Sequence, residues 1–174
     1  MSIRAVRSHV LAAPTLEGAG VRLRRAFGFG DTESTDPFLL LDDFRNDVPD
    51  DYLRGFPWHP HRGIETITYV LAGTVDHADS LGNEGAIGPG DVQWMTAARG
   101  IIHSEMPQQT AGRMRGFQLW INLPSREKMK PAAYREIPPG EIPTMKLDGG
   151  GEVRVMAGQL QQGAGRVRRA AERD

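Results

Sequence analysis

The sequence contains no cysteine. Disulfide bonds, thiolate metal ligands and cysteine nucleophiles are therefore excluded, and any metal ion has to be held by histidine and carboxylate side chains. A long hydrophobic run is also missing. The longest clear apolar stretches, residues 38–41 and 69–72, have the length of strands, whereas a membrane span needs about 18 residues. We therefore expect a chain that does not cross a bilayer.

The chain also lacks an excess of positive or negative charge. The chain has 21 Lys+Arg and 22 Asp+Glu residues and a formal net charge of -1. This balance gives no reason to expect nucleic acid or an anionic membrane as a partner. The first residues do not form the continuous apolar segment of a secretory signal, because Arg4, Arg7 and His9 interrupt it. A cytoplasmic location is the resulting expectation.

The 174 residues are enough for one full hydrophobic core, so we expect one domain. Glycine (21) and proline (12) are frequent and follow no repeat, which indicates many turns. Between these turns lie short runs rich in β-branched and aromatic residues, the pattern of strands. The sequence therefore predicts an all-β fold, with strands at residues 21–27, 38–44, 65–71, 91–96, 101–105, 113–123 and 152–157.

Helical periodicity is almost absent, and residues 125–130 are expected to form one helical turn at most. Turn signals occur at Gly73, at Gly82-Asn83, within residues 88–90 and within residues 98–100. Their short spacing predicts hairpins that join the strands into a sandwich or small barrel.

Residues 159–174 differ in composition from the rest of the chain. They are rich in Gln, Gly and Ala, and Leu160 and Val167 are their only large apolar side chains. We expect this tail to be poorly ordered or at most a short exposed helix. Nucleic-acid binding by its arginines is not favoured, because such charges are more often solvated. The arginines are Arg166, Arg168, Arg169 and Arg173.

The most informative pattern consists of two short motifs, His59-x-His61 and His103-x-Glu105. Side chains two residues apart on a strand point to the same face, so each motif forms a pair of potential ligands. If the two strands face one another inside a barrel, three imidazole nitrogens and one carboxylate oxygen converge. Such a site suits iron(II), manganese, nickel, cobalt, copper or zinc.

The other acidic and histidine candidates are weaker. Glu65 has the same parity as His59 and His61 and is a fifth possible ligand, or else an acceptor that orients an imidazole. His77 and His9 have no partner at ligand spacing, and we expect both to be structural or exposed.

The segments GFPWHPHRGIET (residues 55–66) and GDVQWMTAARGIIHSEMP (residues 90–107) resemble the two metal motifs of the pirin family, a branch of the cupin superfamily. Residues 20–28, 37–44 and 117–124 are also similar to pirin segments. The resemblance implies a cupin double-stranded β-helix, a jelly-roll barrel. It also implies an iron ion, Fe2+, held by His59, His61, His103 and Glu105, which leaves Glu65 outside the metal.

The resemblance covers the N-terminal half of a pirin. Residues 1–158 are expected to form a pirin-like N-terminal cupin domain, and residues 159–174 the polar tail, with the second cupin barrel of pirins absent. The first barrel of a two-barrel pirin presents an apolar face to the second barrel. A homodimer is therefore expected to cover that face in this chain.

The resemblance implies two different functions. One is a dioxygenase similar to quercetin 2,3-dioxygenase, acting on a small aromatic flavonol, with Glu105 as the catalytic residue that accepts the substrate's proton. Phe56, Trp94 and Met95 are candidates for its apolar pocket wall, although Trp94 and Met95 are more readily explained as barrel core. The alternative is a non-catalytic, metal-dependent regulatory protein of the transcription-cofactor type. Room for a two-ring planar ligand beside the metal would favour the enzyme.

Overall fold

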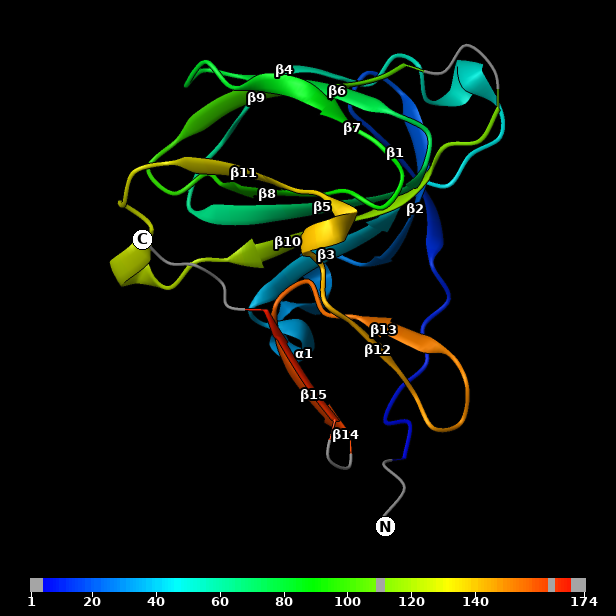
Figure 1. The fold of residues 1–174 in the computed structure, drawn as a ribbon. Coiled ribbons are helices and arrows are strands. Elements are labelled where there is room, and N and C mark those ends of the chain that lie inside the picture. The colour runs from blue at the N-terminus through cyan, green and yellow to red at the C-terminus, as the bar shows by residue number, and fades with distance from the viewer. Residues whose placement is uncertain (1–4, 109–111, 163–164, 170–174) are drawn as a thin grey trace.

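Two antiparallel β-sheets face one another and enclose a barrel in the computed structural model (Figure 1), which describes residues 5–108, 112–162 and 165–169. The larger sheet has the strand order β1 (Ala13–Glu17), β2 (Val21–Phe27), β3 (Phe38–Asp43), β10 (Arg115–Asn122), β5 (Ile64–Ala72), β8 (Val92–Thr96) and β11 (Ala133–Ile137). The smaller sheet has the order β4 (Phe56–His61), β9 (Ile101–Pro107), β6 (Val75–Asp79) and β7 (Glu84–Ile87). The all-β prediction is confirmed.

Helical structure is confined to short pieces within the described residues. They comprise α1 (Thr32–Thr35) and four 3-10 turns at Phe29–Asp31, Pro49–Asp51, Ser125–Glu127 and Pro139–Glu141. The turn at Ser125–Glu127 confirms the single helical turn expected in that segment. Among the described residues, no helix has the length and apolar character that crossing a membrane requires.

The C-terminal segment differs from its prediction. After the hairpin of β12 (Thr144–Lys146) and β13 (Glu152–Arg154), the chain forms a second hairpin of β14 (Gly158–Gln162) and β15 (Gly165–Arg169). The expected irregular or helical tail was wrong in this part. Leu160 and Val167 alternate with polar neighbours and are register partners across the hairpin, which is the two-residue period of a strand pair. Residues 163–164 and 170–174 of the predicted tail lie outside the described residues.

The predicted hairpins are only partly correct. The turn at Gly82 and Asn83 closes the hairpin of β6 and β7. The turns at Gly73, at residues 88–90 and at residues 98–100 instead carry the chain from one sheet to the other, because β5 and β8 lie in the larger sheet and β6, β7 and β9 in the smaller one. A turn signal shows that a strand ends, but it does not identify the strand that the next segment pairs with.

The larger sheet has two distinct faces along β5. Ile64, Thr66, Thr68 and Val70 are buried on its inner face, toward the smaller sheet. Ile67 and Tyr69 point to the outer face, where they pack against the cluster of Val92, Ile137 and Ile142. The segment that follows β11 therefore covers the outside of the sheet, while the inner face is available for a functional site.

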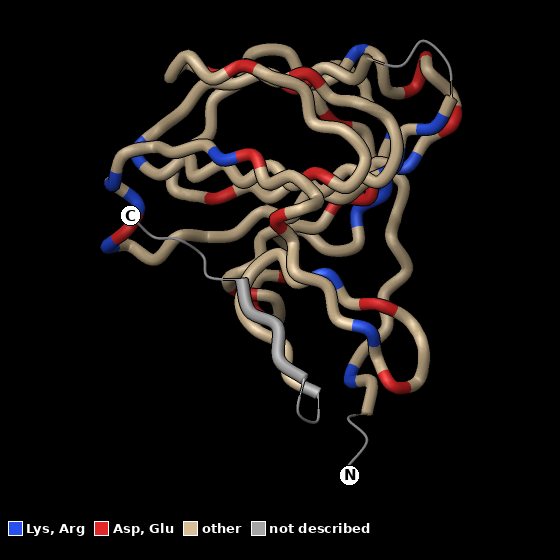
Figure 2. The backbone as a smooth tube through the Cα atoms, viewed as in Figure 1, with Lys and Arg blue, Asp and Glu red and all other residues tan. Residues whose placement is uncertain are grey.

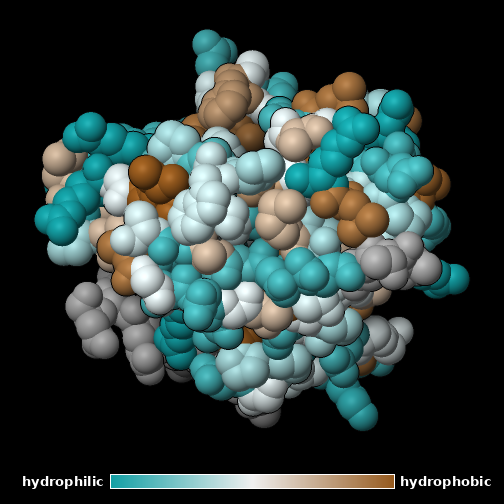
Figure 3. Space-filling view, turned by 90° about the horizontal axis from the view of Figure 1, so that it is seen from above, coloured by the Kyte–Doolittle hydropathy of each residue, from teal (hydrophilic) through white to brown (hydrophobic). Residues whose placement is uncertain are grey.

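Charged residues are distributed over both sheets. Lys and Arg alternate in space with Asp and Glu along the described backbone, without a large region of one sign (Figure 2). Seen from the side of the smaller sheet, apolar side chains lie scattered among hydrophilic ones (Figure 3). Trp58 of β4 and Ile102 of β9 are exposed on that sheet.

We predict that Gly116→Ala strongly destabilises the barrel. Gly116 lies at an irregularity in the pairing of β10 with β5, and a Cβ atom there would overlap the Phe44 ring and the carbonyl oxygen of Tyr69. Overpacking of this kind costs about 1–3 kcal/mol of unfolding free energy. Chemical denaturation measures the loss. Gly30→Ala is the control, because nothing lies within 4 Å of a Cβ at Gly30; equal stability of the two variants would contradict the prediction.

Candidate metal centre

Three histidines meet inside the barrel because β4 pairs with β9. In this antiparallel pair His59 lies opposite His103, and His61 lies two residues further along β4 on the same face. One nitrogen atom from each of His59, His61 and His103 lies within 4.8 Å of the others. The structure therefore brings together the three histidines that the sequence motifs singled out.

The imidazole rings contact one another directly. The ring centroids are separated by 4.5 Å between His59 and His103, by 4.7 Å between His59 and His61, and by 5.0 Å between His61 and His103. Three neutral rings can share this space, whereas three imidazolium ions would repel one another.

The histidine nitrogen atoms fit a metal ion. The Nδ1 atom of His59 lies 2.8 Å from the carbonyl oxygen of Pro57; donation of its proton to that oxygen leaves the Nε2 lone pair available. His103 is 2% exposed, and its Nε2 atom is buried without a hydrogen-bond partner among the described residues. A buried nitrogen without a partner is costly for a folded protein. Coordination of a cation would satisfy it.

Two of the histidines are held in the neutral form that a metal requires. The pKa of His61 is lowered to about 4, mainly by burial and then by His103 and His59, while Glu105 acts in the opposite direction. The pKa of His103 is also lowered to about 4, again mainly by burial and then by His59, while Asp79 acts to raise it. At neutral pH both imidazoles are therefore uncharged, and each keeps a nitrogen lone pair to which a metal ion can bind without displacing a proton.

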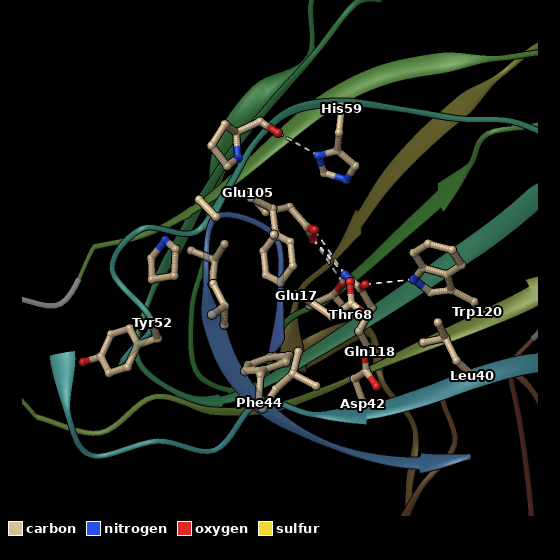
Figure 4. A pocket seen from close by; sticks show the side chains of 18 of the residues that line it. Glu17, Leu40, Asp42, Phe44, Tyr52, His59, Thr68, Glu105, Gln118 and Trp120 are labelled. Atoms are coloured by element: carbon tan, nitrogen blue, oxygen red, sulfur yellow. Dashed lines mark hydrogen bonds between the residues drawn. The ribbon is translucent and has the colours of Figure 1, made fainter. Parts of the chain in front are cut away.

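Glu105 occupies the same inner surface but lies outside the histidine group. It is 5% exposed, and its register partner on β4 is Phe56. The Nε2 atom of Gln118 lies 3.0 Å from Oε1 of Glu105 and 3.2 Å from Oε2, and the hydroxyl of Thr68 lies 3.5 Å from Oε1. The carboxylate is thus bound to the larger sheet in this structure, beside the histidines (Figure 4).

Glu65 does not join the histidine group, as the resemblance implied, and neither role that parity allowed for it, ligand or acceptor for an imidazole, is found among the described contacts. Its carboxylate accepts a hydrogen bond of 2.8 Å from Thr96 and lies 3.9 Å from Nζ of Lys130. The parity argument fails because β4 ends at His61 and β5 starts at Ile64 in the other sheet, so side-chain alternation is not continuous between them.

A cavity of about 520 Å³ adjoins the histidines. His59, His61 and Glu105 line one part of it, and the opposite part is closed by apolar side chains from β2 and the segments around Phe44 and Tyr52 (Figure 4). Ligand sites of proteins typically have volumes of about 300–1,000 Å³ and mostly apolar walls. There is thus room for a planar organic molecule beside the candidate metal centre.

One of the three predicted wall residues lines this cavity. Phe56 lies in its wall. Met95 is buried in the core with Ile64 and Ile101, and Trp94 packs on the outer face of the larger sheet. The alternative interpretation as barrel core is therefore correct for Met95, whereas Trp94 packs outside the barrel.

The remaining histidines agree with their predictions. His77 is buried; it hydrogen-bonds Glu136 at 2.7 Å and also contacts the Tyr134 hydroxyl. His9 is exposed. The site residues that the sequence motifs missed are Thr68, Gln118 and Trp120, which come from β5 and β10 and are brought to Glu105 by the facing of the two sheets.

Comparison with known proteins identifies similar chains. A profile of the Pirin family matches residues 20–121. A pirin-like protein of Caulobacter vibrioides is 53% identical over 163 residues, which cover 94% of this chain and 59% of the relative. This chain spans little more than half the length of the curated relatives that it matches.

Solved structures agree with this result. The crystal structure of quercetin 2,3-dioxygenase from Acinetobacter baumannii has a TM-score of 0.78 and 37% identity, covering 90% of this chain and 58% of that one. The bacterial pirin YhhW from Escherichia coli, solved in complex with nickel(II), has a TM-score of 0.59 and 26% identity, covering 85% of this chain and 65% of that one. Together with the two facing sheets, these similarities confirm the expected cupin barrel.

The lowered histidine pKa values predict a pH-dependent stability of the metal-free protein. Both groups have a pKa of about 4 when folded and 6.5 ordinarily, so the unfolded chain binds more protons between these values. Unfolding free energy should therefore fall as the pH is lowered from 7 to 5, by on the order of 1 kcal/mol for each histidine. Thermal unfolding in the presence of a chelator measures this loss. His61→Gln and His103→Gln should each reduce the pH dependence, and an unchanged dependence in both variants would contradict the assignment.

Proposed function

The chain belongs to the pirin family, and from this membership we propose that it is a metal-dependent dioxygenase of flavonol-type aromatic substrates, similar to quercetin 2,3-dioxygenase. The observation that carries the proposal is the cavity of about 520 Å³ beside His59, His61 and Glu105. A closed histidine cluster would suit a structural or purely regulatory metal, whereas this one borders a space for an organic ligand.

We propose iron as the metal, with His59, His61, His103 and Glu105 as its ligands. The neutral imidazoles and the unpartnered Nε2 atom of His103 support binding of a divalent cation at this position. Nickel(II) in the related Escherichia coli pirin also supports a divalent ion in this family. The choice of iron comes from the family resemblance, since three nitrogens and one oxygen suit several transition metals.

Each part of the site has a separate task in this proposal. Bound iron would supply a Lewis acid and one-electron chemistry toward dioxygen. The apolar side chains of Val21, Leu23 and Phe44 in the cavity wall hold the aromatic rings of the substrate and exclude water. Glu105, at the histidine end of the cavity, accepts the proton of the flavonol hydroxyl.

The proposed ligand set predicts close to one divalent metal per chain. His61→Ala and His103→Ala should each remove most of it, because the site loses a bond and its geometry together. Metal analysis after equilibration with iron(II) without oxygen, followed by gel filtration, measures occupancy. His9→Ala is the control, since His9 is exposed and far from the motif residues in sequence. Full occupancy in both site variants would refute the ligand assignment.

The proposed activity predicts oxygen consumption by the iron-loaded protein in the presence of quercetin. Glu105→Gln should lower kcat by about 10²–10⁴-fold, the usual contribution of a general base. Glu65→Gln is the matched control, because its carboxylate bonds Thr96 and lies outside the cavity lining. An oxygen electrode gives the rates. Equal losses in the two variants would argue against Glu105 as the base.

A non-catalytic regulatory role is the other outcome of the same experiment. Iron-loaded protein that consumes no oxygen with quercetin, at full metal occupancy, would reject the dioxygenase and favour the regulatory alternative. A change of iron oxidation state would then alter the charge beneath a partner surface.

A further inference from the structure

Gln118 and Trp120 form a hydrogen-bonded chain that ends on Glu105. The indole Nε1 of Trp120 donates to Oε1 of Gln118 at 2.9 Å, and the amide nitrogen of Gln118 donates to the carboxylate of Glu105 (Figure 4). Gln118 and Trp120 lie two residues apart on β10 and therefore share one face. Glu105 lies on β9 in the opposite sheet, so the chain connects the two sheets at the candidate metal centre.

Trp120 determines which end of the Gln118 amide faces Glu105. An indole nitrogen can only donate a hydrogen bond, whereas an amide side chain has one accepting and one donating end. Because the oxygen of Gln118 is taken by Trp120, its NH2 group is directed at the carboxylate. Rotation of the amide by half a turn would lose the indole bond and place two oxygens against each other.

The contacts distinguish the two oxygens of Glu105. Oε1 is 3.0 Å from the Gln118 nitrogen and 3.5 Å from the Thr68 hydroxyl, while Oε2 has one hydrogen-bond contact within the described part of the chain, of 3.2 Å, with Gln118. Gln118 and Thr68 are register partners on adjacent strands and are themselves joined by a 3.0 Å hydrogen bond. A carboxylate oxygen can accept about two hydrogen bonds. With two contacts on Oε1 and one on Oε2, Oε2 is the oxygen with more accepting capacity left.

Trp120 also touches a candidate ligand. Its ring meets the ring of His61 edge-on, with centroids 4.8 Å apart and an interplanar angle of 83°. One side chain therefore contacts His61 and, through Gln118, orients Glu105.

We propose that Gln118 and Trp120 are positioning residues of the metal centre: they anchor Oε1 of Glu105 to the larger sheet and leave Oε2 as the oxygen that meets the metal or the substrate's proton. This inference rests on the proposed function, which gives Glu105 those tasks. It adds that the geometry of the carboxylate is set from β10, outside both histidine motifs.

Cobalt(II) is a suitable probe, because its visible spectrum reports the coordination of the ion and its affinity can be measured against a competing chelator. Gln118→Leu should weaken cobalt binding by about 10–100-fold, the usual effect of losing a partner that orients a ligand. It should also shift the spectrum toward that of Glu105→Ala. Trp120→Phe keeps an aromatic ring against His61 but lacks the N–H donor, and it should cause a smaller change in the same direction.

A double-mutant cycle separates positioning from a general structural role. In the Glu105→Ala background, Gln118→Leu should change cobalt affinity by less than about threefold, because the group that it positions is gone. Gln93→Leu is the matched control: Gln93 is a buried glutamine of β8, on the other side of β5 from β10, whose amide contacts Tyr134, and its replacement should leave affinity and spectrum unchanged. If Gln118→Leu does not fold, Trp120→Phe takes its place in the cycle.

Three results would overturn the inference: wild-type affinity in Gln118→Leu, an equal loss with and without Glu105, or the same spectral shift in Gln93→Leu. A wild-type protein that binds no cobalt would overturn it together with the metal centre. Absence of oxygen uptake with quercetin, combined with the expected cobalt results, would reject only the proposed dioxygenase.

Discussion

The antiparallel pairing of β4 with β9 is the constraint on which the candidate site depends. It places His59 opposite His103, and side-chain alternation then turns His61 and Glu105 to the same inner face. Because these rings are packed against one another within the barrel, burial and repulsion from the neighbouring histidines lower the pKa of His61 and His103 and favour their neutral forms. The same pairing thus supplies the position of the nitrogen atoms and the protonation state in which they can bind a cation.

The larger sheet supplies hydrogen-bond partners for polar groups of the smaller sheet. Buried polar groups need partners, and two of those on the smaller sheet find them across the barrel: Glu105 bonds Gln118, and His77 bonds Glu136. These contacts connect the two sheets at two places of the interior. The cavity lies between β2 and the histidine motifs, and its lining includes the contact of Glu105 with Gln118.

Prediction from the sequence succeeded for segments whose own residue types favour a strand. The strand expected at residues 21–27 is β2 (Val21–Phe27), because its β-branched and aromatic residues mark it independently of the rest of the chain. Strands β6 and β7 were not predicted. Asp76, His77 and Asp79 are unusual in strands, and β6 is ordered by its pairing with β9 and β7 rather than by local propensity.

The sequence by itself determined the two ligand motifs, since residues two apart share a face on any strand. Only the tertiary structure decided where the two candidate carboxylates lie. Glu65 is an even number of positions away from His59 and His61, but it lies on a strand of the other sheet and accepts a hydrogen bond from Thr96. Glu105 lies on the inner face, in contact with Gln118 and Thr68, which are remote in sequence. Alternation acts within one strand, whereas the facing of two sheets depends on the packing of the whole chain.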